Sequence, residues 1–136
     1  MHEYSQRDSE FVDKVASMPG GERVTNCYLC GTCTAGCPVA GVEKDYNPRR
    51  IMRKLLLGMK EDVLGASEIW QCSQCHVCVA HCPQDVRLAD VIRVLRQMAV
   101  EEGYAPAELA DEVERLDIEM RKQRAEKIKE LTRRKL

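Results

Sequence analysis

The chain has 136 residues, which is enough for one ordinary domain and too few for two large ones. Its 21 basic and 22 acidic side chains leave a formal charge of -1, which excludes a strongly basic nucleic-acid-binding protein and a polyacidic solvating tail as descriptions of the whole chain. Eight residues are cysteines and only six are aromatic, so the sequence offers little hydrocarbon for a core. We therefore expect another element to stabilise the fold.

The sequence contains neither a recognisable targeting signal nor a membrane span. Residues 1–10 lack the basic and apolar regions of a signal peptide. The longest aliphatic run is three leucines at 55–57, far short of the roughly 18 residues that a membrane-spanning helix needs. These features predict a cytoplasmic protein. Because the cytoplasm keeps thiols reduced, we expect the eight cysteines to bind metal instead of forming disulfides.

The first 26 residues form a leader segment ahead of the first cysteine. Phe11, Val15 and Met18 recur at helical spacing, which predicts a short amphipathic helix packed on the core. The Pro-Gly-Gly sequence that follows Met18 ends this helix, because proline and glycine do not continue one.

Two cysteine runs with identical spacing form an internal repeat. Each run has three cysteines separated by two residues, then a fourth after three more residues, and a proline directly after it. The runs are Cys27, Cys30, Cys33, Cys37 with Pro38 and Cys72, Cys75, Cys78, Cys82 with Pro83.

The segment between the runs has the pattern of helices. Asn47 is a suitable N-cap residue, and Pro48 stands where a proline is tolerated in the first turn. Two glycines indicate breaks, so we expect a second short helix near residues 60–64 and a third, capped by Ser67, through Trp70. The apolar stripe of the first helix consists of Ile51, Leu55 and Met59, flanked by Met52 and Leu56.

Two further helices are predicted after the second run. One spans about 88–102 and stops before Gly103, and the last starts near Ala107 and loses most of its apolar stripe beyond Met120. No segment shows convincing alternation with a period of two, so the fold class is all-α. We expect a leader helix in 1–26, a metal-binding domain in 27–105 and a charged helical extension in 106–136. The two stripes are Leu88, Val91, Ile92, Leu95, Met98, Ala99 and Leu109, Val113, Leu116, Met120.

The cysteine spacing is that of 4Fe-4S ligation. Three thiolates two residues apart wrap three corners of a cubane cluster, and in proteins with two clusters the fourth cysteine of each run binds the other cluster. Two 4Fe-4S clusters with crossed ligation are therefore predicted. The first is held by Cys27, Cys30, Cys33 and Cys82, and the second by Cys72, Cys75, Cys78 and Cys37.

Zinc is the competing metal, because paired C-x2-C units also build tetrahedral zinc sites. Zinc explains four ligands but neither the third regularly spaced cysteine of each run nor the repeated Cys-Pro ending. The second run carries His76 and His81 where the first carries Gly31 and Gly36. With eight cysteines available for eight ligand positions, these histidines are interpreted as polar neighbours of a cluster. Coupling of a cluster potential to protonation and replacement of a ligand are the alternatives.

Two groups of charges stand out. The bases Arg49, Arg50, Arg53 and Lys54 begin the helix between the runs, where they either offset the negative charge of the clusters or form a solvated face. The last helix is mostly acidic from Glu108 to Glu119, whereas residues 121–136 hold eight bases and two acids. This polarity suits the helix dipole, and the helix could also be a docking arm for a larger partner. No aromatic residues interleave the basic stretch, so nucleic-acid binding is not expected.

No nucleotide-binding glycine motif, no Ser–His–Asp pattern and no substrate pocket can be identified in the sequence. Two redox centres without catalytic residues predict electron transfer. A free ferredoxin is one form that such an electron-transfer protein takes. A zinc-stabilised interaction module, which transfers no electrons, is the competing hypothesis.

The cysteine runs, together with several tracts around them, resemble the C-type subunit of soluble heterodisulfide reductase. The resemblance covers roughly residues 10–105, and the architecture is similar to the α-helical ferredoxin fold of the iron–sulfur subunit of succinate dehydrogenase and fumarate reductase. The tracts are Phe11–Val15, Cys27–Pro38, Asp45–Arg50, Ile69-Trp70 and Cys72–Tyr104.

The resemblance implies a role within a hetero-oligomeric oxidoreductase complex. In that family, the C-type subunit takes electrons from an A-type subunit, which contains flavin and iron–sulfur clusters. It passes them to a cysteine-rich B-type subunit, which reduces the disulfide of coenzymes M and B. The C-type subunit is not catalytic alone, and related assemblies use similar subunits for other acceptors. A free ferredoxin, or the iron–sulfur subunit of another dehydrogenase, is the alternative.

Overall fold

The computed structural model describes residues 7–136 and contains helices but no strand within that range, which confirms the predicted all-α class. Residues 1–6 of the expected leader lie outside the described residues. The chain divides into two compact units, one reaching to Ala105 and one spanning Pro106–Leu136. The first unit holds both cysteine runs and the leader helix. The second unit is one helix.

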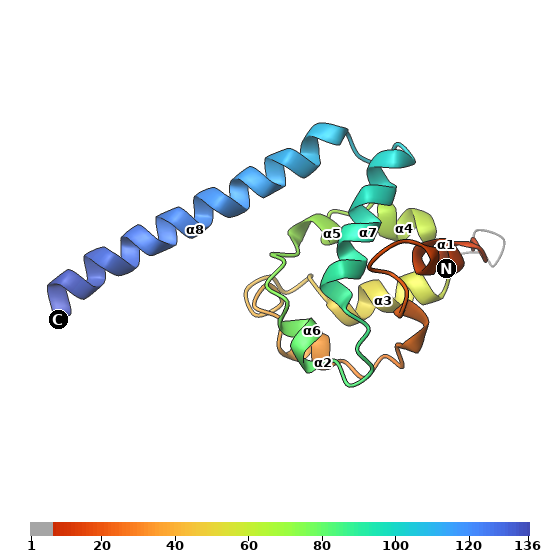
Figure 1. Cartoon of the computed structure of the whole chain (residues 1–136), viewed down its shortest axis with the longest axis horizontal. Helices are drawn as coiled ribbons and strands as arrows, with labels where there is room; N and C mark the ends of the chain where they lie inside the picture. The colour runs from red at the N-terminus through yellow and green to blue at the C-terminus, as the bar shows by residue number, and fades with distance from the viewer. Residues whose placement is uncertain (1–6) are drawn as a thin grey trace. The chain divides into compact units, whose positions relative to one another are not determined.

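Eight short elements make up the described part of the first unit (Figure 1). Both cysteine runs carry a one-turn helix of their own, α2 and α6. In chain order the elements are α1 (Phe11–Ser17), the 3-10 helix η2 (Val24–Asn26), α2 (Thr32–Ala35), α3 (Pro48–Leu56), α4 (Lys60–Leu64), α5 (Glu68–Gln71), α6 (Val77–His81) and α7 (Leu88–Glu101).

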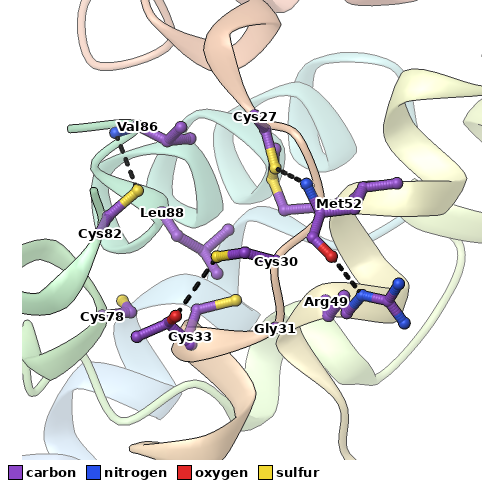
Figure 2. A pocket seen from close by; sticks show the side chains of 12 residues that line it. Cys27, Cys30, Gly31, Cys33, Arg49, Met52, Cys78, Cys82, Val86 and Leu88 are labelled. Carbon is purple, nitrogen blue, oxygen red and sulfur yellow. Dashed lines mark hydrogen bonds between the residues drawn. The ribbon is translucent and has the colours of Figure 1, made fainter. Parts of the chain in front are cut away.

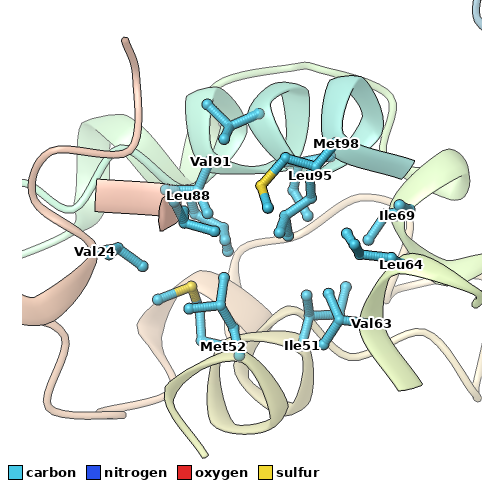
Figure 3. Packing of buried hydrophobic residues seen from close by; sticks show 14 of the residues in the cluster. Val24, Ile51, Met52, Val63, Leu64, Ile69, Leu88, Val91, Leu95 and Met98 are labelled. Carbon is cyan, nitrogen blue, oxygen red and sulfur yellow. The ribbon is translucent and has the colours of Figure 1, made fainter. Parts of the chain in front are cut away.

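Helix α7 is the centre of the hydrophobic core. Its apolar face is covered by α1, α3, α4 and α5, and Leu95 and Met98 have no exposed surface (Figure 3). Each such side chain contributes about 1.5–3 kcal/mol by leaving water. Ile51 and Met52 of α3 and Leu64 of α4 form the opposite wall. The predicted stripe of this helix is buried as expected, because its spacing of three and four residues places those side chains on one face.

Helix α3 begins as the sequence predicts and connects the first cysteine run to the core. The Asn47 side chain accepts a hydrogen bond from the backbone N–H of Arg50 at 3.0 Å, and Pro48 occupies the first turn. The hydroxyl of Thr34, in α2, donates to the Asn47 side chain at 3.0 Å and accepts from the backbone N–H of Arg49 at 2.9 Å. One threonine therefore fixes the first run against the start of α3.

Three local features differ from the sequence-based expectations. Ser67 makes no capping hydrogen bond, because its own backbone is already helical. Helix α3 ends at Leu56, so Met59 belongs to the start of α4 and not to the stripe of α3. The one-turn helices inside the cysteine runs were not predicted, since four or five residues show no periodicity.

The second unit is α8 (Ala107–Lys135), a helix of 29 residues none of which is buried. Its bounds agree with the helix predicted from Ala107 onward. Its length alone would allow it to cross a bilayer, but its charges do not. None of the helices in residues 7–136 combines the length and apolar character of a membrane span.

Candidate metal centre

Two hollows in the first unit are lined by the eight cysteines. Each contains cysteines of both runs, so the chain reverses between the runs and brings them together. The first hollow is lined by Cys27, Cys30, Cys33, Cys78 and Cys82, and the second by Cys33, Cys37, Cys72, Cys75 and Cys78.

The fourth cysteine of each run lies with the opposite run. Cys82 lines the first hollow and not the second, whereas Cys37 lines the second and not the first. Figure 2 shows Cys82 beside Val86 on one side of the first hollow and Cys27 on the other, with Cys30 and Cys33 below them in this view. The structure therefore brings each set of four predicted ligands to one hollow.

The two hollows share a wall. Cys33, Cys78 and Leu88 line both of them. Cys33 comes from α2, Cys78 from α6, and Leu88 is the first residue of α7. Groups held in the two hollows would be neighbours separated by these side chains and not by a layer of core.

The backbone repeats as closely as the sequence spacing. The second residue after the first cysteine of each run has a left-handed conformation, with φ of 61° at Leu29 and 54° at Gln74. The residue directly after the second cysteine of each run also has a left-handed conformation, with φ of 87° at Gly31 and 61° at His76. These turns wind each run into a tight loop that ends in a one-turn helix. The two runs are therefore copies in conformation as well as in sequence.

The helices α2 and α6 pack directly on each other (Figure 1). Gly36 permits this approach, because a Cβ at that position would lie 3.3 Å from Cγ1 of Val77 and 3.6 Å from Nδ1 of His81. His81 occupies the position in the second run that Gly36 occupies in the first. A side chain at position 36 would therefore contact Val77 and His81, and the glycine leaves room for the imidazole at this exposed contact.

Hydrogen bonds to sulfur come from both runs. The backbone N–H of Leu29 donates to Sγ of Cys27, that of Val86 to Sγ of Cys82, and the Gln74 amide to Sγ of Cys72, each at 3.4 Å. The Thr32 hydroxyl lies 3.3 Å from Sγ of Cys30. Donors of this kind stabilise thiolates and tune the potential of a cluster bound to them. This set of donors therefore fits sulfurs that carry negative charge.

Four of the thiols have a pKa that their surroundings shift. Burial raises the pKa of Cys78 to about 11 and also raises the pKa values of Cys27 and Cys33. The hydrogen bond with Thr32 lowers the pKa of the exposed Cys30. Protonated thiols do not bind metal, so metal binding in these hollows releases protons.

Of the four bases at the start of α3, Arg49 lies at the site. Its side chain lines the first hollow, donates to the carbonyl oxygen of Leu29 at 2.6 Å and opposes the rise in the pKa of Cys27 that burial causes. Arg50 and Lys54 instead contact Glu68, at 3.2 and 3.6 Å. Each of the two interpretations of this basic group therefore applies to part of it.

Two residues that position the second run were not identified from the sequence as site residues. Tyr46 is 4% exposed and lines the second hollow, and burial raises its pKa well above the usual value. Arg96 of α7 donates to the carbonyl oxygens of Ile69, Trp70 and Cys72 at 2.8, 3.1 and 2.7 Å. It also lies over the Trp70 ring at 5.5 Å. The signal that could have indicated Arg96 is the presence of an arginine within a strongly apolar helix.

The donor set fits iron–sulfur clusters. Eight thiol side chains line the two hollows. Within residues 7–136, no three His, Cys, Asp or Glu side chains converge on a single ion position. Sulfurs around a hollow are what a cubane requires, because each thiolate binds a different corner. His76 lines the second hollow, whereas His81 does not.

Comparison with known proteins assigns the region that holds both cysteine runs to a family. Residues 19–87 match the family model described as "4Fe-4S dicluster domain". This match and the eight cysteines fit two 4Fe-4S clusters.

Curated relatives extend the similarity. The chain is 40% identical over 96 residues to the C-type iron–sulfur subunit of the CoB--CoM heterodisulfide reductase of Methanopyrus kandleri, which covers 71% of this chain and 50% of that protein. It is 36% identical over 104 residues to the C-type subunit of the H(2):CoB-CoM heterodisulfide,ferredoxin reductase of Methanothermobacter thermautotrophicus, covering 76% and 55%. A C-type iron–sulfur subunit of the CoB--CoM heterodisulfide reductase of Methanocaldococcus jannaschii is 44% identical over 77 residues, covering 57% and 40%. The chain spans about half the length of these relatives.

Proposed function

Because this chain belongs to the 4Fe-4S dicluster domain family, we propose that it is the electron-transfer subunit of a heterodisulfide-reductase-type complex. It would relay electrons between an A-type subunit that carries flavin and iron–sulfur clusters and a cysteine-rich B-type subunit. The observation that carries this proposal is the wall of Cys33, Cys78 and Leu88 common to the two hollows. A relay needs two centres close to each other, and a purely structural cluster does not.

The residues that line each hollow support the ligand sets that the cysteine spacing predicts. Cys27, Cys30, Cys33 and Cys82 would hold the first cluster, and Cys72, Cys75, Cys78 and Cys37 the second. Ligation of each cluster by its own run alone would require Cys37 in the first hollow and Cys82 in the second. Neither cysteine lines the hollow that this alternative needs.

The residues around the sulfurs set the conditions for electron transfer. A bound 4Fe-4S cluster supplies one-electron chemistry at a potential set by its surroundings. Met52, Val86 and Leu88 give the first hollow apolar walls that limit the access of water. The backbone N–H groups of Leu29 and Val86 favour the charged form of the sulfurs to which they donate. The exclusion of water and the hydrogen bonds to sulfur both act on the potential of a cluster, and neither requires a bound substrate.

Each hollow also has its own exposed cysteine. Cys30, in the first run, and Cys75, in the second, are exposed, whereas the other six are partly buried. Tyr28, next to the first hollow, is 59% exposed. In the proposed relay, one partner would approach at Cys30 and the other at Cys75, because electron transfer is fastest where a cluster is least covered by protein.

Reconstitution tests the proposal. Purified A-type and B-type subunits would be combined with the cluster-loaded chain, and reduction of a disulfide or a dye by the B-type subunit would be measured with the reduced A-type subunit as the donor. We expect turnover only with the chain present. The chain alone should accept electrons from dithionite and reduce no disulfide.

A matched pair of variants separates relay from assembly. Cys75→Ser removes a proposed ligand and should abolish turnover while co-purification with the partners persists. Ser73→Ala, which removes another side chain from the lining of the second hollow, should retain turnover. Full turnover without the chain, or disulfide reduction by the chain alone, would refute the relay. Binding to neither partner would favour a free ferredoxin.

A further inference from the structure

The second unit is a single helix with a stripe of exposed apolar side chains along one face. Leu116, Met120 and Leu131 are 56%, 48% and 49% exposed. Leu109 and Val113 share their face, because a helix turns 100° per residue and these five positions fall within a narrow sector of it. We call these five residues the apolar stripe of α8. The family match ends at residue 87, so it says nothing about this helix.

The charges of α8 are divided between its two halves. Residues 108–119 contain six acids and one base, whereas residues 121–135 contain eight bases and two acids. This polarity suits the helix dipole, and pairs one turn apart, such as Arg134 with Glu130, support the isolated helix. Neither effect accounts for a stripe of exposed apolar side chains along the same helix.

We infer that α8 pairs with the α8 helix of a second copy of this chain, and that the two helices run antiparallel. An antiparallel partner places the basic half of one copy along the acidic half of the other, at both ends of the pair. A parallel partner places like charges together along the whole length. The same contact covers the apolar stripe of both copies. This pairing is independent of the proposed relay.

The sequence of α8 has a natural centre for such a pair. When the overlap is centred between Met120 and Arg121, Asp117 lies level with Arg124 of the second copy. Both residues border the apolar stripe on the same side of the helix, so the pair joins opposite charges across the contact. The pair occurs twice because the arrangement has twofold symmetry.

The apolar stripe fits the same centre in part. Leu109 lies almost level with Leu131 of the second copy, and the two Met120 side chains meet near the centre. The stripe is sparse, since Gln123 and Lys127 interrupt it. The geometry therefore points to a reversible dimer and not to an obligate one.

Sedimentation velocity of the full, cluster-loaded chain over a range of concentrations tests the dimer. Leu116→Glu should weaken dimerisation by about a hundredfold or more, because each dimer loses the burial of two leucines, one from each copy. Ile118→Glu is the matched control. Ile118 is 42% exposed but lies on the opposite face of the helix, so its replacement should leave the dimer intact. Circular dichroism would establish that α8 stays helical in both variants.

Charge reversal tests the direction of pairing. The acidic-half variant (Asp117→Lys) and the basic-half variant (Arg124→Glu) should each weaken self-association. A mixture of the two should form a heterodimer. The variant that carries both changes should dimerise again, because its halves remain complementary in the antiparallel direction. A parallel pair would gain nothing from the two changes.

Three results would overturn the inference. The first is a chain that stays monomeric at every concentration tested. The second is a dimer that Leu116→Glu does not affect, since it must use another surface. The third is a monomer that loses binding to an A-type or B-type subunit on Leu116→Glu, which would assign the stripe to that protein. Iron content and reduction by dithionite should be unchanged in all these variants, so failure here is distinguishable from failure of the relay.

Discussion

The two cysteine runs have the same spacing and the same backbone turns, yet their surroundings differ. The first run has glycine at 31 and 36, and Arg49 reaches its hollow. The second run has His76 and His81 at the equivalent positions, and the buried Tyr46 lines its hollow. One ligand pattern has therefore been placed in two environments. The difference teaches that spacing fixes which sulfurs gather, whereas the neighbouring side chains make the two sites unequal.

The comparison has a physical consequence for potentials. A cationic side chain beside a negatively charged cluster favours its reduced form, because reduction adds a further negative charge. The guanidinium of Arg49 acts on the first site, and the second site has a phenol and an imidazole instead. Two clusters of different potential give electrons a preferred direction, which two identical clusters would not.

Removal of both clusters should cause the largest change. Because ligands from distant segments make metal binding part of folding, destroying the clusters by oxidation and chelation should lower the melting temperature by about 10 °C or more. Both runs should lose their turns, and α7 would lose its anchor at Cys82. Circular dichroism and a thermal melt would measure this. An apoprotein with unchanged helix content and an unchanged cooperative melt would contradict the expectation.

The contact between α2 and α6 should accommodate one imidazole better than two. Gly36→His would place a second imidazole against Val77 and His81 and should cost about 1 kcal/mol of unfolding free energy, because these neighbours must shift at an exposed contact. Adding His81→Gly to that variant should restore most of the loss, because the space would again hold one imidazole. Chemical denaturation of the native chain and the two variants would measure it. Equal stability of the single and double variants would show that the two positions do not share one space.

The turn after the second cysteine should respond in opposite directions in the two runs. Gly31 and His76 both have positive φ, which costs a non-glycine residue about 1 kcal/mol. His76→Gly should therefore stabilise the protein by up to about 1 kcal/mol, whereas Gly31→Ala should destabilise it by a similar amount. Urea denaturation monitored by circular dichroism would compare them. The same sign of effect in both runs would refute the equivalence of the two turns.

Asp90 should give the smallest effect and one that depends on pH. Burial by itself favours the neutral carboxyl, but the hydrogen bonds from Arg87 and Arg93, at 2.7 and 2.5 Å, hold the pKa of Asp90 below its usual value. A lowered pKa contributes stability above the unfolded value of about 3.9, and the contribution disappears as pH falls through the folded value. Asp90→Asn should cost about 1 kcal/mol at pH 7.

The measurement for Asp90 is the difference in unfolding free energy between the native chain and Asp90→Asn at pH 7 and at pH 3. Both proteins carry the same clusters, so acid damage to the clusters affects both and cancels in the difference. The difference should shrink at pH 3. A difference that stays constant between the two pH values would show that the ionised carboxylate contributes nothing.

Much of the fold could be predicted because its longer elements have strong local signals. The stripe of α7 has regular helical spacing, and Asn47-Pro48 is a start signal that needs no tertiary context. Helices α2 and α6 could not be predicted, because they are one turn long and form where the cysteines gather. Ser67 has the right chemistry for a cap, but its backbone is already helical, and its side chain makes no capping hydrogen bond.

The candidate site could be predicted from the sequence to a similar extent as the fold. The spacing of the eight cysteines predicts that the two runs come together, and the structure places cysteines of both runs around each hollow. The roles of Tyr46 and Arg96 depend on contacts between segments far apart in the chain, such as the bonds from Arg96 to carbonyl groups 24–27 residues away. Spacing carries no information about such contacts.

Crossed ligation is the central claim, and four serine variants test it most directly. Cys30→Ser and Cys75→Ser each remove a ligand that belongs to its own run under any scheme. Cys82→Ser and Cys37→Ser remove the two ligands whose assignment is at issue. The measurement is the electron paramagnetic resonance spectrum of each dithionite-reduced variant, with its iron content.

The account predicts that Cys82→Ser reproduces the spectrum of Cys30→Ser and that Cys37→Ser reproduces that of Cys75→Ser. Each pair would have lost the same cluster, because its two cysteines line the same hollow. If Cys37→Ser instead matched Cys30→Ser, and Cys82→Ser matched Cys75→Ser, each run would hold its own cluster and the claim would be wrong.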